Sequence, residues 1–357
     1  MKHKTSKIKI IVLILVILLL LLIGGWGVFS ISIYRQTFDQ RFESYAPLRL
    51  EVSDFDGLEA TRYTFPSDKG QMLTGYLYSH GEDPRAVLVI AHGFGGGGHN
   101  SYMDVADFFA AHGFAVFAYD ATACDESEGD GLGGVPQGVA DLDHAITFIE
   151  GELPGLPVVL WGHSWGGYSV CNVLNYHPEV KAVAECSGCC KASDMFEAGG
   201  LQQAGDVIYT MLPFSRAYER LRYGDYAAHM ALDGFAASDA AVMVVHSEDD
   251  DVLPIQYGYD VYYAAYQDDP RFTFVRFTDR GHNMIYNDTT YVDEFNAAFD
   301  EWLTTLDYDY HAAENKDRFA ADKADYINTH LDRERWSHSL DPALFDQFLA
   351  FYEAHIG

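Results

Sequence analysis

The stretch Val158–Val170, VVLWGHSWGGYSV, decides the fold of this chain. An apolar run typical of a buried strand breaks at a serine flanked by small residues, and a helical pattern follows. Glycine weakens strands and helices alike, so Gly162 and Gly166 indicate a turn that requires them. Gly-x-Ser-x-Gly between a strand and a helix is typical of a nucleophile elbow. We therefore predict that Ser164 is a nucleophile, with glycines beside it because larger side chains would collide.

A serine hydroxyl becomes a strong nucleophile only when a neighbouring base removes its proton. Acidic residues directly follow a later apolar run in VMVVHSEDDDVLP, and His282 follows the next run in FVRFTDRGHNMIY. The order Ser164, Asp250, His282 matches a known chain order of catalytic triads. Asp249 and Asp251 flank the candidate acid, so its assignment stays open by one residue.

The anionic intermediate of acyl transfer also needs hydrogen-bond donors. We expect one from the backbone N–H of Trp165, directly after the nucleophile. The other is expected from Phe94 in the glycine-rich loop AHGFGGGGHNSY, whose backbone can approach a substrate closely. His92, before Gly93, is expected to orient this loop by hydrogen bonding, and His163 is expected to pack.

Eight segments have the composition of strands, and most are continuous apolar runs typical of strands buried on both faces. They are residues 60–68, 72–80, 86–93, 114–120, 156–163, 180–188, 240–247 and 272–277. Residues between them show helical spacing, with apolar faces on 139–149 and 292–306. This alternation predicts a doubly wound, mostly parallel α/β sheet. The long interval between the sixth and seventh strands predicts a helical cap.

These motifs resemble the α/β-hydrolase superfamily, most closely its monoglyceride-lipase-like and serine-aminopeptidase-like branch. His92-Gly93, GHSWGG, HSEDDDVLP and RGHN stand at family positions, and the resemblance covers about residues 62–306. It implies the α/β-hydrolase fold with an eight-stranded, mostly parallel sheet, Asp250 as the acid, no cofactor, and a bacterial membrane-anchored member. Ser247 replaces a usual glycine, and DATACDESEGD departs from the family pattern where contacts with substrate are expected.

The N-terminal segment predicts a membrane anchor. Ile10–Ile33 is 24 residues without a charge, enough to span a hydrocarbon layer of about 30 Å. Lysines precede it, so the N-terminus is expected in the cytoplasm and the remainder outside. A cleaved signal peptide is the alternative, because Gly25 and Gly27 suit a cleavage site; the length of the run and the lack of Ala-x-Ala favour the anchor.

The expected organisation has five parts. They are a cytoplasmic tail (1–9), a transmembrane anchor (10–33), a stalk or first contact with the domain (34–57), an α/β-hydrolase domain (58–306, with a cap at about 191–239) and a C-terminal helical extension (307–357).

Composition excludes several partners and ligands. The chain has 53 acidic and 23 basic residues and a net charge of −30, which repels nucleic acid. Five scattered cysteines form no disulfide framework, and CSGCC lacks the second ligand cluster of a zinc site. The acidic run 248–251 lacks the alternating ligands and glycine of an EF-hand calcium loop. We expect no metal and no cofactor.

Two classes of function remain. The first is a serine hydrolase that cleaves carboxylic esters or small amides through an acyl-enzyme. The second is a non-enzymatic surface protein on a hydrolase scaffold, since a fold alone does not establish activity. The ordered triad and the glycine loop favour the enzyme. Ester or lipid substrates come before peptides, because no acidic pair that would hold a substrate amino terminus is identifiable; a serine-aminopeptidase-like peptidase is the alternative.

Overall fold

The computed structural model describes residues 2–81 and 83–357. Eight strands form one sheet in the order β1-β2-β4-β3-β5-β6-β7-β8. They are β1 (Glu59–Pro66), β2 (Met72–Ser79), β3 (Ala86–Ala91), β4 (Phe114–Tyr119), β5 (Val158–His163), β6 (Ala182–Cys186), β7 (Ala241–Ser247) and β8 (Phe272–Phe277). β2 pairs antiparallel with β1 and β4, and the other neighbours are parallel. The predicted mostly parallel, eight-stranded sheet is confirmed.

The burial of the strands explains their composition. Every residue of β3, β4, β5, β6 and β7 is buried, so each reads as a continuous apolar run. The edge strand β1 is mostly exposed and tolerates polar residues. Because β3 to β8 run parallel, their carboxyl ends lie at one edge of the sheet, and ligand sites of open α/β sheets form at this edge.

Helices cover both faces of the sheet. One face packs against α3 (Gln137–Glu152), α4 (Trp165–Asn172) and α8 (Tyr259–Tyr266). The other packs against α2 (Met103–Ala111) and α12 (Pro342–Glu353). Two hydrophobic clusters, one on each face, thus form the core.

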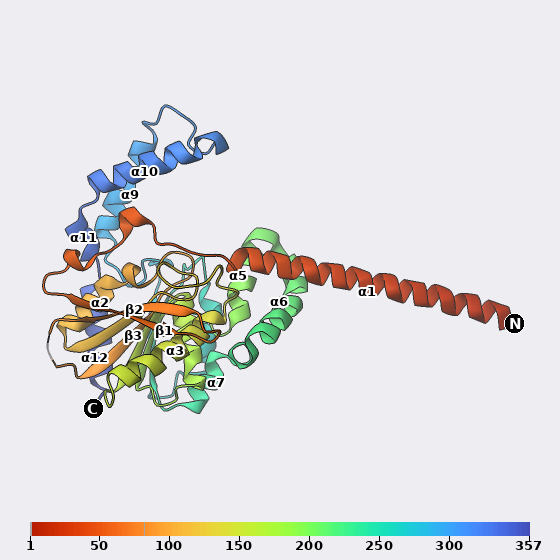
Figure 1. The fold of residues 1–357 in the computed structure, drawn as a ribbon, viewed down its shortest axis with the longest axis horizontal. Coiled ribbons are helices and arrows are strands. Elements are labelled where there is room, and N and C mark those ends of the chain that lie inside the picture. The colour runs from red at the N-terminus through yellow and green to blue at the C-terminus, as the bar shows by residue number, and fades with distance from the viewer. Residues whose placement is uncertain (1, 82) are drawn as a thin grey trace.

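The helix that completes the second face comes from the predicted C-terminal extension. Phe345, Phe348 and Tyr352 of α12 are fully buried, and the Tyr352 hydroxyl donates to the Leu160 carbonyl of β5 over 2.7 Å. The expected apolar helix over 292–306 does form, as α9 (Thr290–Leu303). Its Trp302 ring packs against Tyr326 of α10 (Lys316–His330) instead of the sheet. Figure 1 shows α9 and α10 projecting from the body of the molecule, above α11 (Arg333–Ser337).

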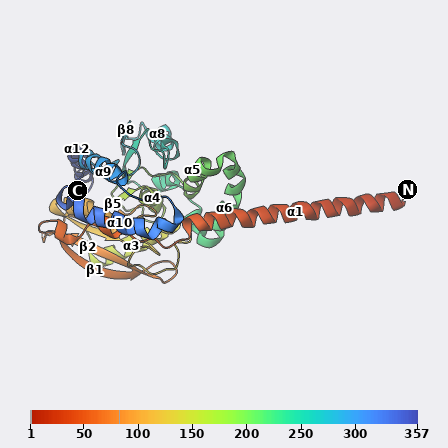
Figure 2. The same ribbon diagram turned by 90° about the horizontal axis from the view of Figure 1, so that it is seen from above.

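Three helices between β6 and β7 form the predicted cap. They are α5 (Ala192–Ala204), α6 (Ile208–Tyr223) and α7 (Ala231–Ala237). Figures 1 and 2 both place α5 and α6 beside the end of the N-terminal helix α1 (Lys2–Phe38).

The helix α1 has an extended half and a docked half. Within the described residues, Ile8–Phe38 is the one helix long and apolar enough to cross a membrane, and it projects far from the domain (Figure 1). Docking on the cap begins at Trp26, whose indole N–H donates to the Thr210 hydroxyl over 3.1 Å. Further along, Ser30 and Tyr34 are fully buried, and the Tyr34 hydroxyl donates to the Glu219 carboxylate.

Residues 34–57 lie on the domain and not in an exposed stalk. Phe38, Ser44, Leu50 and Phe55 are all buried. The contact of α1 with the cap begins at Trp26, inside the predicted span 10–33.

Candidate active site

A strained turn presents Ser164 between β5 and α4. Its backbone has φ +58° and ψ −116°, a region that costs free energy for a residue with a side chain and is found at functional sites. A Cβ on Gly162 would overlap the Gly166 carbonyl, and one on Gly166 would overlap the Ala91 carbonyl at the end of β3. Backbone carbonyl groups thus leave no room for a side chain at Gly162 or Gly166. We had expected instead that side chains at these two positions would collide with each other.

The three residues predicted for the triad lie in one hydrogen-bonded row. Ser164 Oγ is 2.8 Å from His282 Nε2, and His282 Nδ1 is 2.7 Å from Asp250 Oδ2. All three residues are at least nine-tenths buried. Asp249 points elsewhere, because its Oδ1 accepts from the Ser247 hydroxyl and the Gly281 amide.

The environment of Asp250 keeps it ionised. Burial by itself would raise the pKa of this carboxyl, but hydrogen bonds from His246 and His282 hold the pKa well below its usual range. The amides of Val252 and Leu253 donate to Oδ1 over 3.0 and 2.8 Å. Such a carboxylate is fit to orient a histidine and to stabilise its protonated form.

A second buried histidine stands behind Asp250, and sequence reasoning missed it. His246 Nε2 is 3.2 Å from Asp250 Oδ2 and 3.0 Å from the Leu253 carbonyl. Burial lowers the pKa of His246, but Asp250 and the nearby Glu185 outweigh burial and raise it overall. The sequence did offer a sign of this contact, because His246 lies at the end of the β7 segment and four residues before Asp250.

Of the two predicted oxyanion donors, Trp165 directly follows Ser164 in the chain, and Phe94 lines the same cavity as Ser164. No described residue accepts a hydrogen bond from the backbone N–H of Phe94 or of Trp165. The Trp165 side chain is fixed by its indole N–H, which donates to the Val135 carbonyl over 2.8 Å. The Phe94 ring packs against Phe42, at 4.8 Å between ring centroids. Both backbone N–H groups thus lack a partner among the described residues, and the side chains of Phe94 and Trp165 are held in place by their contacts.

His92 ties the glycine loop to β4. Its Nε2 accepts from the Ala121 amide over 3.0 Å, so Nδ1 carries the proton and donates to the Gly93 carbonyl over 2.7 Å. Burial lowers the pKa of His92, which keeps the ring neutral and this tautomer in place. His92 therefore connects the Gly93 carbonyl to the Ala121 amide, which follows β4.

His163, expected only to pack, belongs to a polar relay. The Gly93 amide donates to the Tyr102 hydroxyl (3.0 Å), and that hydroxyl donates to His163 Nδ1 (3.0 Å). His163 Nε2 then donates to the His282 carbonyl over 3.0 Å. Burial is the main cause that lowers the pKa of His163 to about 3. The relay thus joins the glycine loop to the backbone of the candidate base.

Asp125 holds the glycine loop from the other side. Its carboxylate accepts from the amides of Ser44 and Gly98 over 2.7 and 3.0 Å, and from the Asn100 side chain over 3.1 Å. Its backbone is left-handed, with φ +36°. Asp125 lies in the segment that departs from the family pattern, and nothing in the sequence indicated this contact.

A cavity of about 250 Å³ opens above the serine. The glycine loop forms one wall, the cap contributes Met195, and the loop after β7 contributes Val252, which is half exposed. The reacting atoms of a substrate could therefore reach Ser164 from the side covered by the cap.

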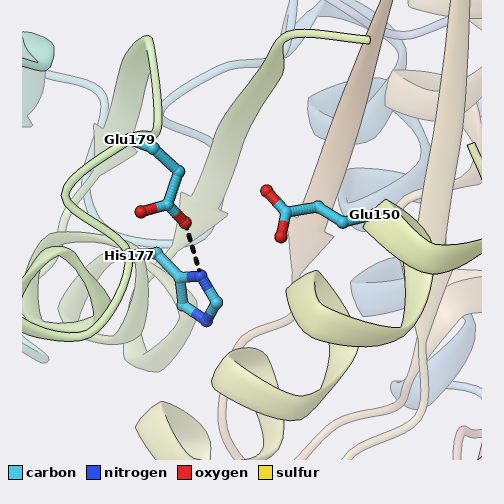
Figure 3. A group of neighbouring side chains, drawn as sticks. All are labelled: Glu150, His177 and Glu179. Atoms are coloured by element: carbon cyan, nitrogen blue, oxygen red, sulfur yellow. Dashed lines mark hydrogen bonds and ion pairs between the residues drawn. The ribbon is translucent and has the colours of Figure 1, made fainter. Parts of the chain in front are cut away.

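A group of two glutamates and a histidine elsewhere is an ion-pair network (Figure 3). His177 Nδ1 is 2.8 Å from Glu179, and Nε2 is 2.8 Å from Asp143, while Glu150 faces them from α3. Burial lowers the pKa of His177, but the hydrogen bonds to the two carboxylates outweigh burial and raise it. Both ring nitrogens of His177 are thus engaged by carboxylate oxygens of the network.

Family models match two overlapping parts of the chain. Residues 82–230 match the serine aminopeptidase S33 family, and residues 157–307 match the prolyl oligopeptidase family. The curated relatives include a monoacylglycerol lipase of Mycolicibacterium smegmatis, 29% identical over 109 residues. They also include the monoglyceride lipase of Homo sapiens, 31% identical over 101 residues. The two alignments cover 30% and 28% of this chain, and 39% and 33% of the relatives.

Solved structures share the fold. An esterase from Pyrococcus furiosus superposes with a TM-score of 0.53 at 15% identity, covering 75% of this chain and 99% of the esterase. Together with the sheet order, this likeness shows that the chain has the α/β-hydrolase fold. Over the matched residues the sequence is similar to the serine aminopeptidase S33 family and to monoglyceride lipases.

Proposed function

We propose that the protein is a serine hydrolase that cleaves carboxylic esters through an acyl-enzyme. The observation that carries the proposal is the hydrogen-bonded row Ser164–His282–Asp250, which lies beside two unpaired amides. Nucleophile, base and orienting acid are within the distances that acyl transfer needs.

In the proposed mechanism, Ser164 Oγ attacks the ester carbonyl carbon while His282 Nε2 takes the hydroxyl proton. The N–H groups of Phe94 and Trp165 bind the resulting oxyanion. The bond to the leaving alcohol then breaks, and His282 donates its proton to that oxygen. Water attacks the acyl-enzyme, again losing a proton to His282, and the released serine regains it. Asp250 stabilises the imidazolium in both halves.

The substrates proposed are esters and lipids ahead of peptides. The relatives named as lipases and the solved esterase favour ester cleavage. The two family models carry peptidase names, and the chain's alternative function is therefore a serine-aminopeptidase-like peptidase.

We further propose that α1 anchors the domain outside the cytoplasmic membrane. The lysines before the apolar run favour a cytoplasmic N-terminus. The uncharged residues 10–25, which precede the contact with the cap, would cover about 24 Å at 1.5 Å per residue. Trp26 and Thr210 would then lie at the membrane surface, with the cap against it. We also propose that the α/β-hydrolase domain includes residues 34–57 and the C-terminal residues 307–357, which contain α12.

Activity is tested on the full chain in detergent micelles. We expect a fluorophosphonate probe to label the protein, and p-nitrophenyl esters to be cleaved faster than aminoacyl-anilides. Ser164→Ala should abolish labelling and turnover while the circular dichroism spectrum stays the same. A folded wild type that neither labels nor cleaves would favour the non-enzymatic scaffold, and preference for the anilides would favour the peptidase.

Orientation is tested by adding protease to intact spheroplasts. The domain should be digested without lysis, and a known outward-facing protein serves as the control for access. Digestion only after lysis would place the domain in the cytoplasm. A mature N-terminus near Gly25–Gly27, measured by mass spectrometry, would favour the cleaved signal peptide.

A further inference from the structure

A second cavity, of about 390 Å³, adjoins the cavity above Ser164. The two share four lining residues, Gly96, Tyr102, His163 and Asn283. The loop that follows His282 forms part of the second cavity through Met284 and Tyr286. In acyl transfer, the base returns its proton to the leaving group, so the leaving group lies near the base. The second cavity is therefore placed to receive the leaving group.

Aromatic side chains form much of its wall. Tyr102 and Tyr286 are buried on the inner side. Trp336, from α11, closes the outer side, and its indole N–H donates to the Leu48 carbonyl over 3.3 Å. The outer wall thus comes from segments before β1 and after α10, outside the region matched by the family models.

One carboxylate in this wall lacks a compensating charge. Asp104 is only 7% exposed, and its Oδ1 accepts from the Val105 amide over 2.8 Å. No other described residue forms a hydrogen bond or ion pair with it. Burial raises its pKa to about 7, with Asp107 adding to the rise and His338 opposing it. A buried carboxylate without a partner costs free energy that a bound cation would recover.

The arginine in the same wall is directed elsewhere. Arg49 lines the cavity, but its guanidinium pairs with Asp125 at 3.4 Å. The wall thus combines several aromatic side chains with one carboxylate that has no charged partner among the described residues. Organic ammonium groups are recognised by this combination, through cation–π attraction and ion pairing.

We propose that this cavity binds an organic ammonium group in the leaving alcohol of the substrate, so that amino-alcohol esters are preferred. The proposal rests on the proposed esterase function. Asp104 supplies the counter-charge, and Tyr102, Tyr286 and Trp336 supply the aromatic faces. The strongly acidic chain adds a long-range attraction for cationic substrates.

The test compares choline butyrate with an isosteric ester that carries a tert-butyl group in place of the trimethylammonium group. For the full chain in micelles, kcat/KM should be about tenfold higher for the cationic ester. Asp104→Asn, which keeps an acceptor for the Val105 amide, should reduce this ratio about tenfold. Asp56→Asn, which removes one exposed charge elsewhere, is the matched control and should leave the ratio unchanged. A wild-type ratio near one would overturn the proposal while leaving the esterase function intact.

Binding of choline to Ser164→Ala, measured by calorimetry, separates the two proposals. Choline should bind, and the additional change Asp104→Asn should abolish the heat signal. If choline binding depends on Asp104 but the wild-type protein hydrolyses neither ester, the result would support the proposed ammonium site and refute the proposed esterase function. No binding of choline, or binding that Asp104→Asn leaves unchanged, would overturn the cavity proposal.

Discussion

The ring of Phe38, in the last turn of α1, packs against the ring of Phe94 in the glycine loop, with 5.2 Å between centroids. The helix that projects from the domain thus contacts a residue whose backbone N–H is a proposed oxyanion donor. Phe42 touches the same ring from the following segment. The position of the glycine loop therefore depends on the N-terminal segment as well as on the sheet.

Shortening Phe38 should affect activity beyond its effect on stability. Phe38→Ala removes a buried ring and should cost about 3–5 kcal/mol of unfolding free energy. Because the ring also supports Phe94, we expect kcat of the folded variant to fall roughly tenfold. Phe109→Ala, equally buried on the opposite face, is the control and should lose stability alone. Equal loss of kcat in both variants would contradict this link.

Asparagine scanning should identify the acid. Asp250→Asn should reduce kcat on the order of 10⁴-fold, because His282 would be held in the wrong tautomer. Asp249→Asn and Asp251→Asn should keep kcat within a few-fold of wild type. Steady-state kinetics with one p-nitrophenyl ester suffices, and a larger loss at Asp249 would move the assignment.

The relay through Tyr102 should matter for catalysis. Tyr102→Phe removes the acceptor of the Gly93 amide and the donor to His163. We expect kcat to fall about tenfold with little change in KM, since a hydrogen bond of this kind contributes roughly 1 kcal/mol or more. Tyr78→Phe is a matched control, because the buried Tyr78 hydroxyl has no partner among the described residues. A Tyr102→Phe enzyme with wild-type kcat would show that the relay is dispensable.

Glu185 should make stability depend on pH. Burial raises its pKa from 4.5 to about 7. Between these values the unfolded chain loses the proton that the folded chain keeps, so the contribution of Glu185 to stability falls as pH rises and stays low above pH 7. Glu185→Gln retains an acceptor for the Gly188 amide. It should therefore stabilise the protein by up to about 3 kcal/mol at pH 8 and by little near pH 4.5.

Urea unfolding followed by tryptophan fluorescence measures this difference. The control is Glu59→Gln, at an exposed position. It should leave the urea midpoint of unfolding unchanged at pH 8 and near pH 4.5. A Glu185→Gln protein less stable than wild type at both pH values would contradict the proposed cost of ionisation.

The strands and the turn around Ser164 were predictable because their signals are local. Buried parallel strands leave continuous apolar runs, and a strained turn leaves glycines. The helix that completes the core was not predictable in this way. α9 and α12 both carry apolar residues at helical spacing, and only the tertiary arrangement decides which one meets the sheet.

The supporting residues of the candidate site escaped prediction for the same reason. His282 follows a strand in a recognisable motif, whereas Tyr102 and Asp125 act through contacts with residues far away in the chain. A hydroxyl or carboxylate with such a role looks like any other polar residue in a sequence. His246 is intermediate, since it lies in the motif but was not given a role.

The two ends of the chain complete opposite faces of the sheet, with α1 in one hydrophobic cluster and α12 in the other, and this has a consequence for biosynthesis. The ribosome makes α1 first, whereas the α12 residues buried against the sheet come some 300 positions later. The nascent chain therefore remains without a complete core while its apolar N-terminal helix is already available to the insertion machinery. If the domain is exported as proposed, it crosses the membrane before it has folded. Folding then ends on the far side, when α12 reaches a sheet that is already tethered.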